Sequence, residues 1–537
     1  MKNKWMLYLM ILLCLLNAGN AVAQTKQKPN VLFIAIDDLK PILGCYGDKL
    51  IKTPNIDRLA KMGTVFMSNY CQQAVCGPTR ASLMTGMRPD YTKVWDLKTT
   101  MRSMNPDILS LPQYFISQGY STQGIGKVYD QRCVDKDLDK PSWSVPYYKT
   151  ENKYYAASTG KPAIDRYQLK ETKQLVEKYT TEAKDKGLKG AEVNDYVVAK
   201  IRPTTECIDV PDNAYVDGAN TLQAKDIIIQ LGKKNEPFFF AVGLSKPHLP
   251  FVAPKKYWDL YNREEMPVAT YQEKPKNAVD IALHTAGEIK GYSDIPPLLA
   301  FTDQKDYGVT LPLDKQKELI HGYYAAVSYS DAQVGILLNT LDSLGLTNNT
   351  IIVLWGDHGW HLGDHNLWCK HTNFEQAAKA PLIIAAPGIS PNKTKSSSEF
   401  VDIFPTLCDL AGLQIPNHLD GKSLVPVMKN PAVSVKEFSV SQYPRSGPDA
   451  EKERLGYADT RYMGYSIRTS RYRYTVWMKD GFRSTNVFNE TLVAGVELYD
   501  YKKDPLEKVN VANNKKYKSV ARDMNSKMMA FFKSQVR

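Results

Sequence analysis

The stretch "NVLFIAIDDL" at residues 30–39 decides the expected fold, because it is a continuous apolar run that ends in two acids. The same plan recurs in "EPFFFAVGLSKPHLPF" at residues 236–251 and in "NTIIVLWGDHGWHLGDH" at residues 349–365. Continuous β-branched and aromatic runs of this length predict strands buried on both faces. Helical patterns such as "NTLQAKDIIIQLGKK" lie between them. The sequence therefore predicts an α/β fold with a central, mostly parallel sheet flanked by helices.

Polar side chains follow each predicted strand, and in open α/β sheets ligands bind beyond the carboxyl ends of the strands. Asp37 and Asp38 follow the first run, and Asp357 and His358 follow the third. Alone, Asp37 and Asp38 read as well as a loop start or a helix cap. Together, three carboxylates and an imidazole suit a divalent cation. Oxygen ligands favour Ca²⁺ or Mg²⁺, although histidine is less usual around Ca²⁺.

Three regions are expected along the 537 residues. Residues 1–23 have a basic start, a short apolar run and "AVA" before Gln24, which is typical of a secretory signal peptide. Residues 24–432 form the predicted catalytic domain, with a polar, helix-containing insertion at about residues 150–215. Residues 433–537 form a smaller C-terminal α+β subdomain, since "YMGYSIRTSRYRYTVWM" alternates as an antiparallel sheet would.

The composition bounds the partners and the compartment. The formal charge of +12 becomes +10 once Lys2 and Lys4 leave with the signal peptide, which favours polyanionic partners. The sequence has no nucleic-acid motif and no further run long enough to span a membrane. We therefore expect a secreted or periplasmic protein with an anionic extracellular substrate.

The stretch "VCGPTRASL" at residues 75–83 holds the most conspicuous cysteine. Seven cysteines remain after the signal peptide, so at least one is unpaired. Cys76 reads as a buried thiol, as half a disulfide or as a nucleophile. Pro78 suits the first turn of a helix, whose N-terminus would face an anion, and Arg80 could reach the same place.

"CGPTR" matches the sulfatase signature, a cysteine followed by x-Pro-x-Arg. Further matches run along nearly the whole mature chain, including "PNVLFIAIDDL", "GKVYD", "SKPHLPF" and "GDHGWHLGDHNLWCKHTNFEQAAKAPLI". The sequence resembles the type I sulfatases of the alkaline-phosphatase superfamily, and among them most of all the iduronate-2-sulfatases. The resemblance implies an alkaline-phosphatase-like fold and a sulfuric ester hydrolase.

The resemblance also implies a modified nucleophile. In that family the motif cysteine is oxidised to formylglycine by a maturing enzyme, which would therefore be a partner of this chain. Carried onto this sequence, Cys76 is the modified residue, and its hydrated aldehyde supplies two hydroxyls. One hydroxyl attacks sulfur and displaces the alcohol; the other then expels sulfate and regenerates the aldehyde, a step that a thiol could not perform.

Other roles follow from position in the matched motifs. The residues that match metal ligands are Asp37, Asp38, Cys76 in its modified form, Asp357 and His358. The residues that match the remaining catalytic groups are Arg80, which orients the nucleophile, Lys127 and Lys370, which contact nucleophile or sulfate, and His248, the general acid on the leaving-group side.

One departure concerns the substrate. Asp130 stands where the iduronate-2-sulfatase pattern has a histidine, three residues after the lysine of "GK". We therefore expect an exported sulfatase acting on sugars of glycosaminoglycans or of algal polysaccharides such as ulvan or carrageenan. A phosphoester or phosphonate hydrolase on the same scaffold is the alternative, and a non-catalytic binder of sulfated glycans is the third hypothesis.

Overall fold

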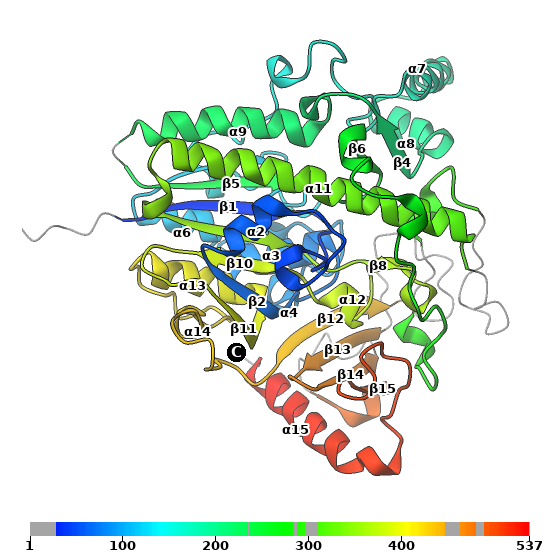
Figure 1. The fold of residues 1–537 in the computed structure, drawn as a ribbon. Coiled ribbons are helices and arrows are strands. Elements are labelled where there is room, and N and C mark those ends of the chain that lie inside the picture. The colour runs from blue at the N-terminus through cyan, green and yellow to red at the C-terminus, as the bar shows by residue number, and fades with distance from the viewer. Residues whose placement is uncertain are drawn as a thin grey trace, which may run out of the picture.

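A seven-stranded sheet crosses the centre of the molecule in the order β11-β2-β10-β7-β1-β5-β3 (Figure 1). The computed structural model describes residues 28–234, 236–283, 287–296, 310–445, 462–479 and 488–535, so the predicted signal peptide lies outside the described residues. The strands are β1 (Asn30–Ile36), β2 (Thr64–Tyr70), β3 (Ser121–Gly126), β5 (Phe238–Leu244), β7 (Thr350–Gly356), β10 (Leu382–Ala385) and β11 (Asn392–Glu399).

The sheet is mixed, with one strand running against the others. β1 pairs in parallel with β5 and β7, and β5 pairs in parallel with β3. β10 is antiparallel to both of its neighbours, β2 and β7, while β11 is parallel to β2. The predicted central, mostly parallel sheet is confirmed.

Helices cover both faces of this sheet, as buried strands require. Leu32, Ile34 and Ile36 of β1 pack into the core on one face, and the alternate residues of β1 pack into the core on the other. The first face carries α2 (Pro54–Ala60), α9 (Val216–Gly232) and the long α11 (Leu313–Ser343). The second face carries α3 (Cys76–Thr85), α6 (Leu111–Ser117), α13 (Ile403–Leu410) and α14 (Val425–Lys429). Short helices in the connections are α4 (Pro89–Thr92), α5 (Met101–Met104), α10 (Lys255–Trp258) and α12 (Glu375–Ala378).

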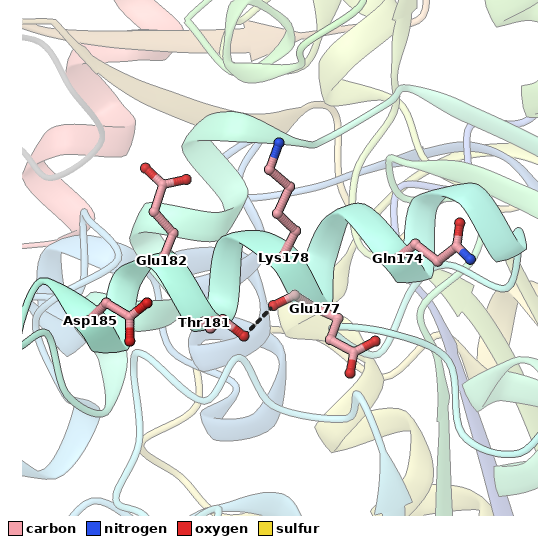
Figure 2. A pocket seen from close by; sticks show the side chains of 6 residues that line it. All are labelled: Gln174, Glu177, Lys178, Thr181, Glu182 and Asp185. Carbon is pink, nitrogen blue, oxygen red and sulfur yellow. Dashed lines mark hydrogen bonds between the residues drawn. The ribbon is translucent and has the colours of Figure 1, made fainter.

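The polar insertion contains the helix that the sequence predicts and a second one, α7 (Lys170–Asp185) and α8 (Ala191–Lys200). It ends in β4 (Thr205–Ile208), which pairs in parallel with β6 (Phe251–Pro254). Figure 2 shows the side chains that line a pocket along α7, namely Gln174, Glu177, Lys178, Thr181, Glu182 and Asp185. These are mostly exposed polar groups on a single helix, so this pocket is a solvated helix face.

The C-terminal region forms a separate antiparallel sheet in the order β12-β13-β14-β15. Its strands are β12 (Ser439–Arg445), β13 (Tyr462–Arg468), β14 (Tyr472–Lys479) and β15 (Val493–Asp500), and α15 (Lys518–Ser534) packs against them (Figure 1). A two-stranded ribbon, β8 (His361–Leu362) and β9 (Trp368–Cys369), lies between β7 and β10 in sequence. The antiparallel sheet agrees with the prediction, whereas the domain boundary at residue 432 stays a prediction.

Two further observations concern the compartment. Within the described ranges, none of the helices combines the length and apolar character needed to cross a bilayer. The seven cysteines of the described chain are all free thiols, and only Cys207 is exposed. Cys76 is therefore not the one cysteine that remains after the others have formed disulfides.

Candidate active site

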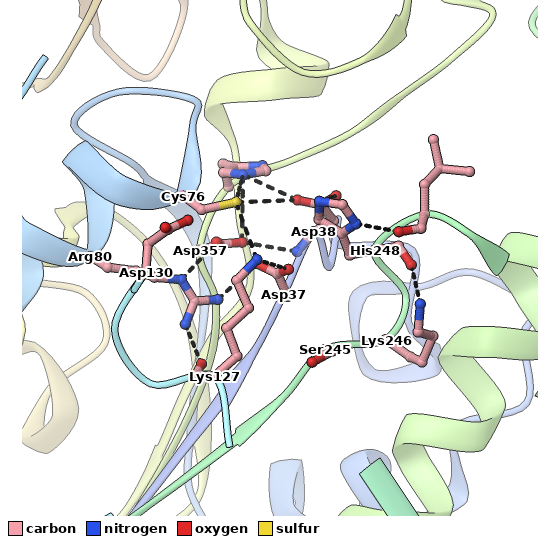
Figure 3. Close-up of polar contacts among 12 residues, drawn as sticks. Asp37, Asp38, Cys76, Arg80, Lys127, Asp130, Ser245, Lys246, His248 and Asp357 are labelled. Carbon is pink, nitrogen blue, oxygen red and sulfur yellow. Dashed lines mark hydrogen bonds and ion pairs between the residues drawn. The ribbon is translucent and has the colours of Figure 1, made fainter. Parts of the chain in front are cut away.

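Four neighbouring strands end at the same edge of the central sheet, and polar residues follow each of them. Because β7, β1, β5 and β3 are parallel neighbours, their carboxyl ends meet at one edge. Figure 3 shows the resulting cluster, to which the N-terminus of α3 adds Cys76. The residues that follow these strands are Asp357 and His358 after β7, Asp37 and Asp38 after β1, Lys246 and His248 after β5, and Lys127 and Asp130 after β3.

Arg80 fixes two of these strand ends to each other. Its Nη2 donates to Asp37 Oδ1 over 2.9 Å, and its Nε donates to Asp357 Oδ2 over 3.0 Å. Its Nη1 donates to the carbonyl of Val128 over 2.9 Å, and the guanidinium lies 5.2 Å from the ring centre of Trp355. The side chain is fully buried. Arg80 therefore holds β1, β7 and the segment after β3 in register around the N-terminus of α3.

The two adjacent acids after β1 have opposite electrostatic environments. Burial alone would raise the pKa of Asp37, but Lys127 and Arg80 hold it well below its usual range. Burial raises the pKa of Asp38 well above its usual range, and Asp37, Glu288 and Asp357 add to this, while Lys370 opposes it. Asp38 also has a φ of 59°, which an aspartate tolerates better than most residues. Asp38 is thus a buried carboxyl group whose one ammonium partner, Lys370, does not offset burial and the neighbouring carboxylates.

Cys76 lies in the middle of the cluster. Its Sγ is 3.5 Å from His358 Nε2, 3.9 Å from Asp38 Oδ1 and 3.9 Å from Lys127 Nζ. Burial raises the pKa of the Cys76 thiol well above its usual range, and Asp37 raises it further. A thiol in this environment stays protonated and is a poor nucleophile as it stands.

His358 is oriented as metal-binding histidines usually are. Its Nδ1 contacts the carbonyl of Gly359 at 2.9 Å and must be the donor there, so Nε2 of the neutral ring has its lone pair toward the cluster. Burial lowers the pKa of His358, which favours the neutral ring. Nε2 is 3.2 Å from Asp38 Oδ1 and 3.7 Å from Asp357 Oδ1.

The donor set fits a divalent cation. Ligand atoms of Asp38, Cys76, Asp357 and His358 lie within 4.8 Å of one another, and those of Asp37, Asp38 and His248 form an overlapping group. Several carboxylate oxygens that converge on one point are what Ca²⁺ or Mg²⁺ sites offer. Four of the five predicted ligands are therefore in one group, and Asp37 is bound to Arg80 and Lys127 beside it.

Two further predicted residues, Lys370 and His248, lie beside Asp38. Lys370 Nζ donates to Asp38 Oδ1 over 2.9 Å and lies 4.9 Å from the ring centre of Trp360. His248 Nδ1 contacts the carbonyl of Leu249, so it is the donor there and Nε2 faces the cluster, 3.7 Å from Asp38 Oδ2. The structure thus brings every predicted site residue together.

Glu288 is a residue of the cluster that the sequence analysis did not find. Its Oε1 lies 3.2 Å from Lys370 Nζ and 3.4 Å from His248 Nε2, and its side chain is only 11% exposed. It belongs to a polar segment, "GEIKGY", that no motif or period marks. Glu288 therefore pairs with the lysine and the histidine that are expected to meet sulfate.

Lys246 and two histidines after β7, His361 and His365, have structural partners. Lys246 Nζ donates to the carbonyls of His248 and Pro250, at 2.6 and 2.7 Å, and so shapes the turn after β5. His361 binds Asp364 and the Thr372 hydroxyl, the latter at 2.8 Å. His365 Nε2 donates to the carbonyl of Leu506 over 2.8 Å. These two histidines hold the segment after β7 in contact with Thr372 and Leu506.

The comparisons with known proteins agree on a class. The sequence model of the sulfatase family matches residues 29–413, and a second one, described as the C-terminal part of N-sulphoglucosamine sulphohydrolase, matches residues 363–534. The chain belongs to the sulfatase family, within the alkaline-phosphatase superfamily, and is a sulfuric ester hydrolase by class.

Among its relatives is human iduronate 2-sulfatase, 33% identical over 541 residues that cover 91% of this chain and 92% of that protein. A solved structure in complex with its substrate D-glucosamine-2-N,6-O-disulfate superposes with a TM-score of 0.68, at 20% identity, over 95% of this chain and 99% of that one. The phosphonate monoester hydrolase of Agrobacterium radiobacter superposes with a TM-score of 0.64, at 23% identity, over 94% and 96%. These two structures share the fold.

Proposed function

We propose that this protein is an exported sulfatase that hydrolyses sulfate esters on sugars of a sulfated acidic polysaccharide or its oligosaccharides. The substrates would be of the glycosaminoglycan or the algal ulvan and carrageenan type. The observation that carries the proposal is Cys76 at the N-terminus of α3, within 4 Å of His358, Asp38 and Lys127. The likeness to iduronate 2-sulfatase over nine-tenths of both chains supports a sugar substrate.

Formylglycine at position 76 supplies the nucleophile that the protonated thiol does not. One hydroxyl of its hydrated aldehyde forms a bond to sulfur while the bond from sulfur to the sugar oxygen breaks. The second hydroxyl then loses its proton and forms the aldehyde carbonyl, and the bond between carbon and the sulfate oxygen breaks. The maturing enzyme that oxidises Cys76 is the implied partner.

The surrounding residues hold charges and protons in place for both steps. Arg80 and Lys127 are positioned to hold the modified side chain, and Lys370 is positioned to hold a sulfate oxygen. His248 donates its Nδ1 proton to Leu249, so Nε2 carries a proton for the departing sugar oxygen only in the imidazolium form. Burial, with Lys370 and Lys127, holds the pKa of His248 well below its usual range. An incoming sulfate would favour that protonated ring, because its negative charge stabilises imidazolium.

A divalent cation would be held by Asp37, Asp38, Asp357, His358 and the modified Cys76, as Ca²⁺ or Mg²⁺. When bound, it would offset carboxylate charge and the charge that develops on the sulfate oxygens. Removing one charge-stabilising donor from such a site typically costs about 3–4 kcal/mol of barrier, so several of these groups must act together.

The experiment has two readouts on the same preparation, made together with a sulfatase-maturing enzyme. Mass spectrometry of the peptide that contains residue 76 should show the aldehyde in place of the thiol. Free sulfate should appear from a panel of defined sulfated oligosaccharides. An active preparation with an unmodified cysteine would contradict the mechanism, and no release by a fully modified protein would contradict the function.

The second candidate is a phosphoester or phosphonate hydrolase, which the likeness to the phosphonate monoester hydrolase fold keeps open. Parallel assays on matched aryl sulfate, phosphate and phosphonate esters separate the two. Dominant turnover of the phosphorus esters would replace the sulfatase proposal.

A further inference from the structure

The loop after β3 places an ion pair beside the nucleophile. Asp130 is 2% exposed, and both of its oxygens accept from Arg132. Arg132 Nε donates to Oδ1 over 2.9 Å and Nη2 to Oδ2 over 2.7 Å, while the Arg132 backbone N–H donates to Oδ1 over 3.0 Å. Two parallel bonds of this kind fix the plane of a guanidinium.

Asp130 itself is unsuited to donate a proton. Burial alone would raise its pKa, but the hydrogen bonds from Arg132 and the charge of Lys127 hold the pKa of Asp130 well below its usual range. The carboxylate is therefore ionised, and its oxygens are occupied. The iduronate-2-sulfatase pattern has a histidine at position 130. In this chain the loop instead exposes the side of the Arg132 guanidinium that faces away from Asp130.

Arg132 is held near Cys76 and still accessible. Its side chain is 46% exposed, and within the described part of the chain its Nη1 has no hydrogen-bond partner. The next residue, Cys133, packs so closely on Gly77 that a Cβ there would lie 2.3 Å from its Sγ. Asp130 also acts electrostatically on Lys127 and Arg80, and Figure 3 draws it beside both. Cys76 also acts electrostatically on Arg132, so the partly exposed guanidinium lies close to the nucleophile.

We propose that Arg132 is a specificity residue that binds a second anionic group of the substrate, a carboxylate or a sulfate close to the scissile sulfate. This inference rests on the proposed sulfatase function. A guanidinium matches such planar or trigonal oxygen arrays, and its partial exposure leaves N–H groups for a ligand. Because Asp130 already fixes its orientation, little side-chain entropy is lost when the anion binds.

The test compares substrates with one and with two negative charges. The first is 4-nitrophenyl sulfate, the second a sulfated uronic acid glycoside, the third its carboxyl-reduced counterpart and the fourth a disulfated sugar without a carboxylate. The variants are Arg132→Gln and Arg132→Lys. The matched control is Arg471→Gln, since Arg471 is 39% exposed and forms the same two-pronged pair with Asp500, at 2.8 and 2.8 Å, in the C-terminal sheet.

For Arg132→Gln we expect KM to rise by about 10- to 100-fold on substrates with the second anion, well beyond any change on 4-nitrophenyl sulfate. Arg132→Lys should recover part of the loss, and Arg471→Gln should match the wild type. Selective loss on the uronic acid or on the disulfated sugar identifies carboxylate or sulfate as the ligand. If Arg132→Gln raises KM equally on all four substrates, or does not raise it, the inference about Arg132 is wrong and the proposed sulfatase function is unaffected. No sulfate release by the modified wild type overturns the proposed function as well.

Discussion

Replacing Arg80 by methionine tests whether this residue holds the site together. The variant loses the hydrogen bonds to Asp37, Asp357 and the Val128 carbonyl, at 2.9, 3.0 and 2.9 Å. Asp37 keeps Lys127 as a partner, whereas within the described residues Asp357 keeps the Asp38 backbone N–H at 2.9 Å and His358 Nε2 at 3.7 Å. The cost should therefore come mostly from Asp357, which is fully buried.

Breaking a buried pair from one side typically costs about 3–5 kcal/mol, because it leaves an uncompensated charge. We expect that loss of unfolding free energy for Arg80→Met in urea, followed by tryptophan fluorescence. Arg80→Lys keeps the charge but not the planar fork, and should lose an intermediate amount. Added Ca²⁺ should restore part of the stability, because a cation would pair with the carboxylates that Arg80 no longer pairs with.

Turnover of 4-nitrophenyl sulfate by the folded Arg80→Met variant should fall by about 100- to 1,000-fold. The control is Arg473→Met, since Arg473 is equally buried and pairs with Glu375 and Glu507, at 2.7 and 3.2 Å, away from Cys76. It should lose comparable stability but keep its turnover per folded molecule. An Arg80→Met protein within about 1 kcal/mol of the wild type would refute the role given to Arg80.

Three other predictions follow from the charges. Chelation should lower the melting temperature, and Ca²⁺ should restore it. The gain from Ca²⁺ should be larger at pH 8 than at pH 5, because the raised pKa of Asp38 makes protons compete with the cation. An equal gain in melting temperature at both pH values would contradict this competition. Burial raises the pKa of Glu497 from 4.5 to about 7, so the folded wild type should lose up to about 3 kcal/mol of unfolding free energy between pH 4.5 and 8. Glu497→Gln should not show this loss. Parallel pH profiles of unfolding free energy for the two proteins would contradict the role given to Glu497. Glu288→Gln removes a negative charge 3.2 Å from Lys370 Nζ, so inorganic sulfate should inhibit it roughly tenfold more tightly, and an unchanged inhibition constant would place the sulfate elsewhere.

The strands could be predicted because burial on both faces leaves a clear mark in the sequence. The runs at β1, β5 and β7 are continuous and apolar, and each is followed by polar residues that serve the site. β10 is different, because "LIIA" is too short to show its direction, and its antiparallel pairing depends on the path of residues 357–381 from β7. Strand order likewise follows from tertiary packing that local sequence does not encode.

The site could be predicted where a motif carries the chemistry. Asp37, Asp38, Asp357 and His358 were found because acids beside buried strands need a compensating charge. Glu288 could not be found, because a polar segment of the loop contributes it and only its contacts with Lys370 and His248 identify it. The role of Asp130 was visible as a departure from the family pattern, but that its oxygens face Arg132 required the structure.

The charge balance of the cluster explains why cation and proton compete for Asp38. Apart from the Asp130–Arg132 pair, whose charges cancel, the described cations around Cys76 are Arg80, Lys127 and Lys370, and the carboxylates are Asp37, Asp38, Asp357 and Glu288. Three positive charges against four negative ones leave a formal charge of −1, which repels a sulfate ester. A proton or a monovalent ion brings the cluster only to neutrality, whereas a divalent ion brings it to +1 and makes it complementary to a singly charged sulfate ester. Burial is the main cause of the raised pKa of Asp38, and the surplus of carboxylates adds to it, so a proton on Asp38 supplies the missing charge when no ion is bound. Metal dependence and pH dependence of sulfate binding should therefore change together, because both report the charge on one carboxylate.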